Sequence, residues 1–424
     1  MRKSIIKSIA ACALAFLAAG CEDAKYEVLE NLVYISDAYN AKTKDITMLE
    51  GTTRTSIIVR MAQATDKDVT VSLKMDEAYL DEYNAINQTD FKVVPDAIFD
   101  RTVSIPAGDV SSEPVVVEIP YFETNGASYV LPISIEDVQG DVEKAASSSR
   151  LIINLVKPIH QFVPKFTWYN GMKAAPEDTD WGLSLTNYTL EWWSRVTGKN
   201  GDSSGYSKNN QAIFDSGSSS TELYIRFGDL VYASGGVYYN NFLQIKTMGD
   251  MQIDTGDPTS EGNGLTSGVW YHFAVTYDSA TGKCTMYKNG IESGLATGAA
   301  GRPMLIDKFS MISSGSQYFP DFCELCQVRL WKTTRTASQL QKGMYSEVAY
   351  DNPDLILYLP MSETARIISY TDNTQSAEID PAKTISSIVL KDVTGNGHDV
   401  TVGNMGLSST SGSSVTWAEY TFSK

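Results

Sequence analysis

The stretch 268–290, GVWYHFAVTYDSATGKCTMYKNG, constrains the fold of this chain more than any other. Two sets of side chains alternate over 269–277, which is the period of two that marks a β-strand with two differently used faces. Turn-forming residues fill 279–283, and 284–288 returns as a second strand. Asn289 and Gly290 then tolerate the positive φ that a tight hairpin turn requires. The segment therefore predicts a long antiparallel sheet.

Short Val- and Ile-rich segments, separated by turn signals, occupy the N-terminal third of the chain. We expect strands at 55–62, 68–75, 101–105, 114–119, 129–135 and 150–156. The exception is 76–87, where Asp76 can cap a helix and one face carries Tyr79, Leu80, Tyr83 and Ile86. The acidic residues of this segment, Asp76, Glu77, Asp81 and Glu82, are expected to be solvated. Strands at this spacing predict an immunoglobulin-like β-sandwich with one helical excursion.

A change of composition divides the chain. Residues 157–164 contain two prolines, which stiffen a connecting segment, and we expect a hinge there. Beyond it, Gly, Ser, Trp and Tyr become more frequent. Further strands are expected at 188–193, 213–217, 222–229, 241–246, 322–331 and 355–361, with a short helix at 337–344. The whole chain is therefore predicted to be all-β.

Several of these segments resemble known families. YTLEWW at 188–193, the hairpin at 268–290, ELCQVRLWKTTR at 324–335 and the loop at 392–399 resemble laminin-G-like, concanavalin A-type jelly rolls, a fold widely used to bind carbohydrate. The run VTVSLKMDEAYLDEYNAINQTDFKVVPDAIF with VSIPAGDVSSEPVVVEI resembles an uncharacterised domain at the N-terminus of Bacteroides-type surface lipoproteins and some endoglycosidases. The resemblance implies an immunoglobulin-like domain over 27–157, a linker over 158–165 and a concanavalin A-like jelly roll over 166–424. The N-terminal domain would act as a spacer or platform.

The N-terminus predicts export. Arg2, Lys3 and Lys7 precede an apolar run at 8–19, which is too short to span a bilayer and is typical of a cleaved signal. The end of the run, LAAGC, resembles a bacterial lipobox, which implies a signal peptide over 1–20, lipidation of Cys21 and a tether over 21–26. Glu22 and Asp23 resemble a surface-export signal of Bacteroides-type lipoproteins and imply the outer face of the outer membrane. The alternative is an ordinary signal peptide that happens to contain Cys21.

Charge limits the partners. The formal net charge of the 424-residue chain is −17. Nucleic acids and anionic lipids need clusters of Lys and Arg, so neither is expected as a partner. Neutral ligands such as glycans remain, and the membrane is expected to be reached only through the lipid.

Three cysteines remain beyond Cys21, and two of them form a C-x-x-C motif at Cys323 and Cys326. A zinc site needs about four ligands, and only these three cysteines and three scattered histidines (His160, His272, His398) are available. A redox motif needs a helix start, whereas this segment is predicted to be a strand. We therefore expect neither a metal nor a redox role. A disulfide from Cys284 to Cys323 or Cys326 is the more plausible alternative, with its pairing open.

No catalytic motif is present. Jelly-roll β-glucanases cleave with carboxylates spaced Glu-x-Asp-x-x-Glu on one strand, and residues 166–424 contain no such triplet. Glu324 lies in the corresponding strand, and Asp321, three residues earlier, is expected on the opposite face. We therefore predict a protein that is not an enzyme.

Sugar rings stack on exposed aromatic side chains while amides and carboxylates bind their hydroxyls. Candidate ligand-binding residues in polar loops are Trp168, Tyr169, Trp181, Tyr206, Tyr238, Tyr239, Asn240, Tyr318 and Phe319. We assign Trp193, Trp270, Phe273 and Trp331 to the core. No cofactor is expected to be required, and calcium stays unassigned, with Asp229, Asp254 and Asp257 in loops.

The sequence thus predicts a non-catalytic, surface-exposed lipoprotein that binds poly- or oligosaccharide. It would assist the capture of polysaccharide or glycoprotein glycans beside an outer-membrane uptake system, in association with transporter components. The first alternative is an adhesin that recognises host protein or matrix. The second is a divergent glycoside hydrolase.

Overall fold

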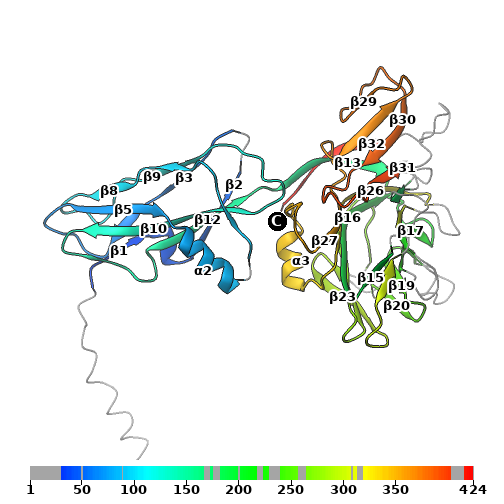
Figure 1. The fold of residues 1–424 in the computed structure, drawn as a ribbon, viewed down its shortest axis with the longest axis horizontal. Helices are drawn as coiled ribbons and strands as arrows, with labels where there is room; N and C mark the ends of the chain where they lie inside the picture. Colours follow the sequence, from blue (N-terminus) through cyan, green and yellow to red (C-terminus); the bar gives the residue numbers. More distant parts are fainter. Residues whose placement is uncertain are drawn as a thin grey trace, which may run out of the picture. The chain divides into compact units, whose positions relative to one another are not determined.

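The computed structural model describes residues 30–48, 51–87, 89–166, 172–174, 182–198, 201–216, 223–228, 239–255, 264–306, 309–312, 319–402 and 415–423. The chain divides into two compact units. The N-terminal unit comprises Met1–Glu123 and Ser128–Val156, and the C-terminal unit comprises Thr124–Ala127 and Lys157–Lys424. Both units are built almost entirely from strands (Figure 1).

The N-terminal unit is a β-sandwich. One layer is a sheet in the order β2 (Thr43–Thr47), β12 (Arg150–Val156), β10 (Tyr129–Gln139), β5 (Val69–Met75) and β8 (Thr102–Ile105), with β6 (Lys92–Val93) beside β10. Two three-stranded sheets complete the unit: β3 (Thr53–Ile57), β9 (Val115–Ile119), β7 (Ile98–Phe99); and β11 (Glu143–Lys144), β1 (Leu32–Ile35), β4 (Val59–Met61). Alternate residues of all three sheets meet in one core of Val, Ile and Leu. The predicted sandwich is confirmed.

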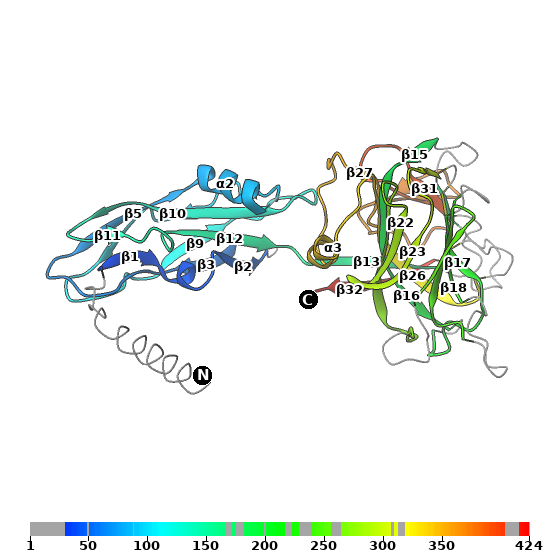
Figure 2. The same cartoon turned by 90° about the horizontal axis from the view of Figure 1, so that it is seen from below.

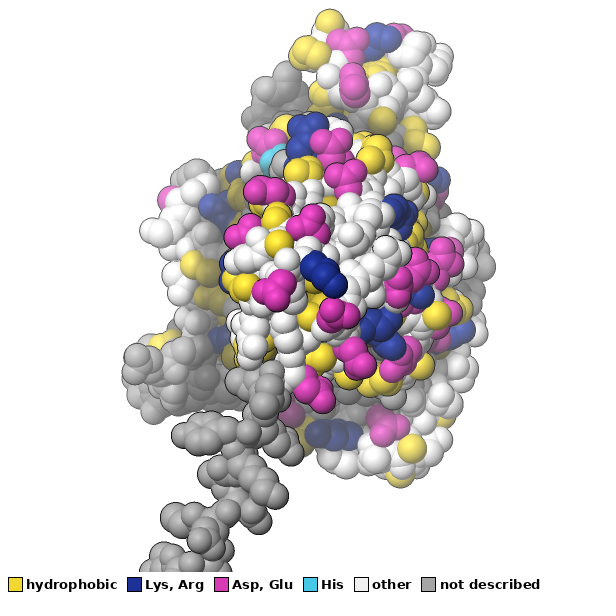
Figure 3. All heavy atoms as spheres, turned by 90° about the vertical axis from the view of Figure 1, so that its left-hand side faces the viewer, with side chains coloured by type: hydrophobic (Ala, Val, Ile, Leu, Met, Phe, Trp, Pro, Cys, Tyr) yellow, Lys and Arg dark blue, Asp and Glu magenta, His cyan; other side chains and the backbone are white. Residues whose placement is uncertain are grey.

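The predicted helix is also confirmed, as α2 (Glu77–Asn87). The Asp76 carboxylate accepts a hydrogen bond from the backbone N–H of Tyr79 at 3.3 Å, so Asp76 caps the first turn. Leu80 is buried in a small cluster against the sheet, with Tyr79 and Tyr83 packed on it. Ile86 was expected on the same face but is 72% exposed, so the apolar face ends before the last turn of the helix. Glu77, Asp81 and Glu82 are exposed, as expected for a solvated face, whereas the capping Asp76 side chain is only 12% exposed. Figure 3 shows acidic side chains spread over the face in view, with Lys and Arg between them.

The C-terminal unit is a second, larger sandwich, and its two layers are visible edge-on in Figure 2. The eight-stranded sheet has the order β23 (Ile291–Thr297), β22 (Lys283–Lys288), β21 (Trp270–Asp278), β16 (Asn187–Thr197), β26 (Phe322–Trp331), β13 (Ile159–Phe166), β32 (Thr416–Phe422), with β27 (Leu355–Leu359) beside β26. The ten-stranded sheet has the order β20 (Met251–Asp254), β19 (Leu243–Thr247), β18 (Leu223–Phe227), β17 (Gln211–Ser216), β25 (Ser310–Met311), β14 (Met172–Ala174), β31 (Val400–Val402), β30 (Ile385–Leu390), β28 (Arg366–Tyr370), β29 (Gln375–Ser376). A short pair, β15 (Leu183–Leu185) and β24 (Met304–Ile306), and the helix α3 (Ala337–Gly343) complete the unit.

The predicted hairpins form as expected. β21 pairs with β22, and Asn289 (φ 52°) and Gly290 (φ 72°) make the two-residue turn into β23. Phe273, Trp193 and Trp331 are buried, and Trp270 packs against the core while staying partly exposed. These aromatic residues belong to the scaffold, as assigned.

The predicted linker over 158–165 is wrong. Residues 159–166 form β13, which pairs with β32 along its whole length from Ile159 opposite Phe422 to Lys165 opposite Thr416. Its burial alternates, with Ile159, Gln161 and Val163 inside. The two prolines led to the linker prediction, because the strand's partner lies more than two hundred residues later in the chain.

The predicted disulfide is also wrong, because Cys284, Cys323 and Cys326 are all free and buried. Cys284 lies on β22 and the other two lie on β26, with β21 and β16 between these strands. Three strand spacings of about 4.8 Å place β22 and β26 roughly 14 Å apart, well beyond the reach of a disulfide.

Candidate functional site

One face of the ten-stranded sheet is the core, and the other carries a line of mostly polar side chains. The core side includes Ile225, Ile245 and Ile253, each fully or almost fully buried. The opposite side of five neighbouring strands, read through the pairing register, presents Gln252, Lys246, Tyr224, Asp215 and Ser310. The register continues through Lys173 on β14 to Thr401 on β31. We call Gln252, Lys246, Tyr224, Asp215, Ser310 and Thr401 the polar row, and strand β14 lies between the last two. Gln252 and Thr401 are exposed, and the four positions from Lys246 to Ser310 are partly exposed.

A hydrogen-bond network holds the row at β18. The Asn210 side-chain oxygen accepts from the Tyr224 hydroxyl at 2.8 Å and from Arg226 Nη1 at 2.8 Å. The Arg226 guanidinium also lies 5.2 Å from the centre of the Tyr224 ring and donates through Nε to the Gln244 side-chain oxygen at 2.9 Å. Gln244 Nε2 in turn donates to Asp254 at 2.7 Å. Because the hydroxyl and one face of the Tyr224 ring are both held in this way, the side chain is preorganised.

Tyr239 and Asn240 lie at the end of β18, next to this network. A Cβ on Gly228 would come within 2.8 Å of the Asn240 Cα, so only glycine allows the two segments to approach this closely. Gly228 also has φ +67°, and its N–H donates to the Phe242 carbonyl at 3.0 Å. Both Tyr239 and Asn240 are half-exposed. These two predicted residues therefore stand beside the polar row.

Comparison with known proteins names the fold. Residues 170–341 match the family model of the concanavalin A-like lectin/glucanases superfamily. The C-terminal unit is a concanavalin A-like domain. Residues 29–142 match a second model, described as an N-terminal domain. No curated protein matches the chain in sequence.

Solved structures resemble this chain to very different extents. A protein of Bacteroides ovatus proposed to bind carbohydrate is 20% identical, covers 93% of this chain and 98% of its own, and has a TM-score of 0.56. EndoBT-3987 of Bacteroides thetaiotamicron, solved with a Man5GlcNAc product, is 21% identical over 30% of each chain, with a TM-score of 0.26. A SAP-like pentraxin from Limulus polyphemus is 12% identical, covers 58% of this chain and 98% of its own, and has a TM-score of 0.32. At 20% identity, the first likeness establishes the fold alone.

Two predicted aromatic ligands are not on the surface of the concanavalin A-like domain. Tyr206 is 6% exposed and Phe319 is fully buried, so the expectation that they are exposed is wrong. Both rings pack against Phe227, with centroids 5.3 and 6.3 Å away, and fill one end of the core. The remaining candidates lie outside the described residues: Cys21, Trp168, Tyr169, Trp181, Tyr238 and Tyr318.

The acidic candidates for calcium are partly visible. Asp254 accepts hydrogen bonds from Gln244 and Gln252 at the edge of the polar row. Asp229 and Asp257 lie outside the described residues. Within the part of the chain that is described, no three His, Cys, Asp or Glu side chains are grouped so that they could hold a metal ion. Calcium stays unassigned.

The carboxylates around β26 are used for structure. Asp321 accepts hydrogen bonds from the backbone and hydroxyl of Ser207 and from Gln211, at 2.7–2.9 Å. Glu324 accepts from Arg195 and from the Tyr420 hydroxyl, both at 2.7 Å. The two side chains are each 1% exposed and have separate partners, as expected for opposite sides of a strand. They do not form the carboxylate pair that glycoside hydrolysis needs.

A third buried carboxylate, Glu191, lies on the outer side of the eight-stranded sheet. It accepts a hydrogen bond from Trp331 Nε1 at 2.8 Å and lies 3.2 Å from His272 Nε2. Arg329 and Arg335 approach within 3.8 and 3.9 Å. Burial raises the pKa of Glu191, but the His272 hydrogen bond and the two guanidinium groups outweigh it and lower that pKa to about 2.

The residues after β26 close over this carboxylate. Arg329 donates to the backbone carbonyls of Gly343 and Ser346, and Trp193 Nε1 donates to the Met344 carbonyl at 2.7 Å. Sequence reasoning missed this cluster, because its members come from three strands and look like ordinary strand residues. Glu191, His272 and Arg329 are each 1–2% exposed, so we assign the cluster to the stability of the domain.

Proposed function

We propose that the concanavalin A-like domain binds polysaccharide along the polar row, and that the chain is a non-catalytic surface lipoprotein. The observation that carries the proposal is the register, which brings polar side chains from six strands into one line on the non-core face. Fold likeness to a protein of Bacteroides ovatus proposed to bind carbohydrate supports the same ligand class.

The length of the row suits a chain-like ligand. Strands lie about 4.8 Å apart, so the six intervals from Gln252 to Thr401 span roughly 29 Å. Tyr224 offers a ring face for stacking, and its neighbours in the row offer an amide, an ammonium, a carboxylate and hydroxyls for hydrogen bonds. Tyr239 and Asn240, at the end of β18, would widen the surface on one side of the row. This mixture fits several hydroxylated sugar rings in succession.

Binding without cleavage is supported by the burial and the hydrogen-bond partners of three acidic residues. Asp321, Glu324 and Glu191 are each 1% exposed and are held by hydrogen bonds or ion pairs. A buried carboxylate with such partners can neither protonate a glycosidic oxygen nor attack the sugar.

Attachment to the membrane belongs to the proposal. No helix in the described part of the chain is long and apolar enough to cross a membrane. Cys21 would carry the lipid, and the N-terminal sandwich would serve as a spacer that presents the concanavalin A-like domain outside the outer membrane. Glycans captured there would pass to a neighbouring uptake system and its transporter.

The test uses the chain from Glu22 onward, without signal and lipid, in affinity electrophoresis and calorimetry against a panel of polysaccharides. We expect at least one neutral polysaccharide to bind, and Tyr224→Ala to weaken it tenfold or more. Tyr121→Ala is the matched control, because Tyr121 is an exposed tyrosine of the N-terminal unit. Thermal unfolding of each variant checks that the fold is retained.

Three outcomes would overturn the proposal. Binding that Tyr224→Ala leaves unchanged would remove the polar row from the site. Binding of a host matrix protein with no glycan bound would favour the adhesin. Release of reducing sugar from a bound polysaccharide would favour the glycoside hydrolase.

A further inference from the structure

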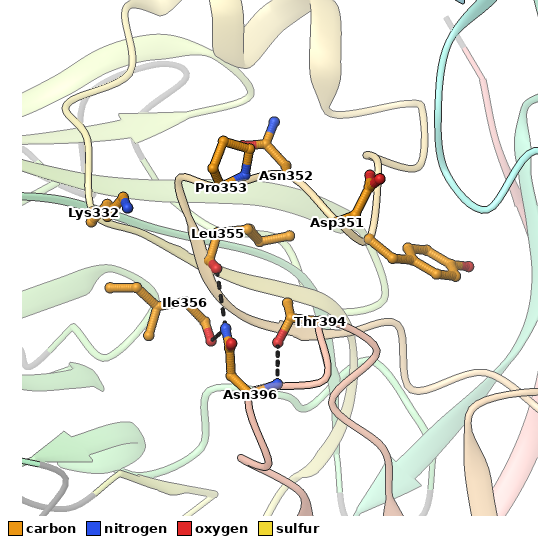
Figure 4. A pocket seen from close by; sticks show the side chains of 9 residues that line it. Lys332, Asp351, Asn352, Pro353, Leu355, Ile356, Thr394 and Asn396 are labelled. Atoms are coloured by element: carbon orange, nitrogen blue, oxygen red, sulfur yellow. Dashed lines mark hydrogen bonds between the residues drawn. The ribbon is translucent and has the colours of Figure 1, made fainter.

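A second polar hollow lies in the concanavalin A-like domain, away from the polar row. It has a volume of about 330 Å³ and opens between the loop before β27 and the loop after β30 (Figure 4). Lys332, Asp351 and Asn352 line it together with Thr394 and Asn396. None of its lining residues belongs to the polar row. The volume is at the lower end of the range for small-molecule sites.

The two loops are locked together under the pocket. Asn396 Nδ2 donates to the carbonyls of Leu355 and Ile356, at 3.3 and 2.8 Å, and Figure 4 shows both contacts. The Asp392 carboxylate accepts from the backbone N–H groups of Tyr358, Thr394 and His398. The pocket floor is therefore formed before any ligand arrives, which lowers the entropy lost on binding.

The two charged groups of the pocket are not used by the fold. Within the described residues, neither the Lys332 ammonium nor the Asp351 carboxylate has a hydrogen-bond or ion-pair partner, and Figure 4 places them on different sides of the hollow. Asn396 commits its N–H₂ group to backbone carbonyls, so its side-chain oxygen is left as an acceptor. Tyr350 adds an aromatic ring, held edge-on against Tyr358 at 5.7 Å.

The pocket thus contains a hydrogen-bond donor and acceptors that do not pair with each other. Such a pocket fits a ligand whose groups can both donate and accept hydrogen bonds. A sugar hydroxyl accepts a hydrogen bond from an ammonium and donates one to a carboxylate or an amide oxygen. We propose that this pocket binds a single neutral sugar ring, with its hydroxyls on Lys332, Asp351 and Asn396 and its C–H face toward Tyr350. The proposal rests on the proposed function only for the ligand class, because the two sites share no residue.

Saturation-transfer NMR on the chain from Glu22 onward tests the pocket, with methyl glycosides of glucose, galactose, mannose and N-acetylglucosamine as probes. We expect transfer to at least one glycoside, reduced fivefold or more in Lys332→Ala and in Asp351→Ala. Tyr224→Ala should retain this signal, because it alters the polar row alone. Lys342→Ala and Asp66→Ala, which change exposed residues outside the pocket, are the matched controls.

The outcomes separate this proposal from the proposed function. Polysaccharide binding without any glycoside signal overturns the pocket and leaves the polar row standing. A signal lost in Tyr224→Ala and kept in both pocket variants also overturns it. Glucuronate binding that needs Lys332 but not Asp351, with no neutral glycoside bound, would replace the neutral sugar by an acidic one. Glycoside binding that depends on both pocket residues, without binding of any polysaccharide, would support the pocket and remove the proposed function.

Discussion

Replacing Glu191 by glutamine should destabilise the concanavalin A-like domain by about 3 kcal/mol. Glutamine retains the size of the side chain and an oxygen that can accept from Trp331. What it removes is the negative charge beside Arg329 and Arg335, and Arg329 is almost fully buried. Breaking one side of a buried ion pair costs roughly 3–5 kcal/mol, because the other charge is left uncompensated.

The pKa of Glu191 leads to the same magnitude. The folded protein lowers it from 4.5 to about 2. Each unit is worth about 1.4 kcal/mol, so the ionised form contributes on the order of 3 kcal/mol to folding. Since the folded pKa is depressed, this contribution is complete above the unfolded pKa and is lost as the pH falls through the folded value. The free energy of unfolding should therefore drop between pH 4.5 and 2, and less steeply in Glu191→Gln.

Urea unfolding followed by tryptophan fluorescence measures the effect. All seven tryptophans lie at or beyond residue 168, so the signal reports the C-terminal unit alone. Glu292→Gln, at an exposed position on β23, is the control and should change stability by less than about 0.5 kcal/mol. A loss below 1 kcal/mol for Glu191→Gln, or identical pH dependence in variant and parent, would refute the reasoning.

Three further results are expected. Gly290→Ala should cost more stability than Gly395→Ala in urea unfolding, because both have positive φ but only at Gly290 would a Cβ meet Gln341, at 2.4 Å; equal losses would contradict that contact. The buried thiols of Cys284, Cys323 and Cys326 should be inert to a thiol reagent in the folded chain, and all three should react after unfolding. Two thiols that fail to react after unfolding would reveal a disulfide. Burial lowers the pKa of His272, so stability should fall as the pH drops below 6.5, and His272→Gln should flatten this fall if the imidazole causes it.

Local features of the fold were predictable from sequence. The helix at 76–87 is specified by a capping residue and one apolar face, and the turn at Asn289 and Gly290 by positive φ; both form as expected. Such features depend on neighbours within a few residues, so a single sequence contains the information. The matches to family patterns then extended these local predictions to whole domains.

Features set by distant pairing were not predictable. Residues 159–166 look like a proline-stiffened linker until their partner at 416–422 is known. Tyr206 and Phe319 follow polar, turn-rich segments, yet both face Phe227 in the core. The proximity that a disulfide needs is likewise decided by strand order, which places two strands between Cys284 and the other cysteines.

The sequence by itself determined that this chain is all-β, that it has two domains, and that the second follows the concanavalin A-like pattern, because alternation, turn chemistry and capping are short-range properties. The tertiary structure alone decided which side chains lie together. The polar row joins residues from 215 to 401, and the pocket joins loops near 352 and 396. A site made of single residues from many strands exists only once the sheet register is set, since each strand contributes one side chain in the line.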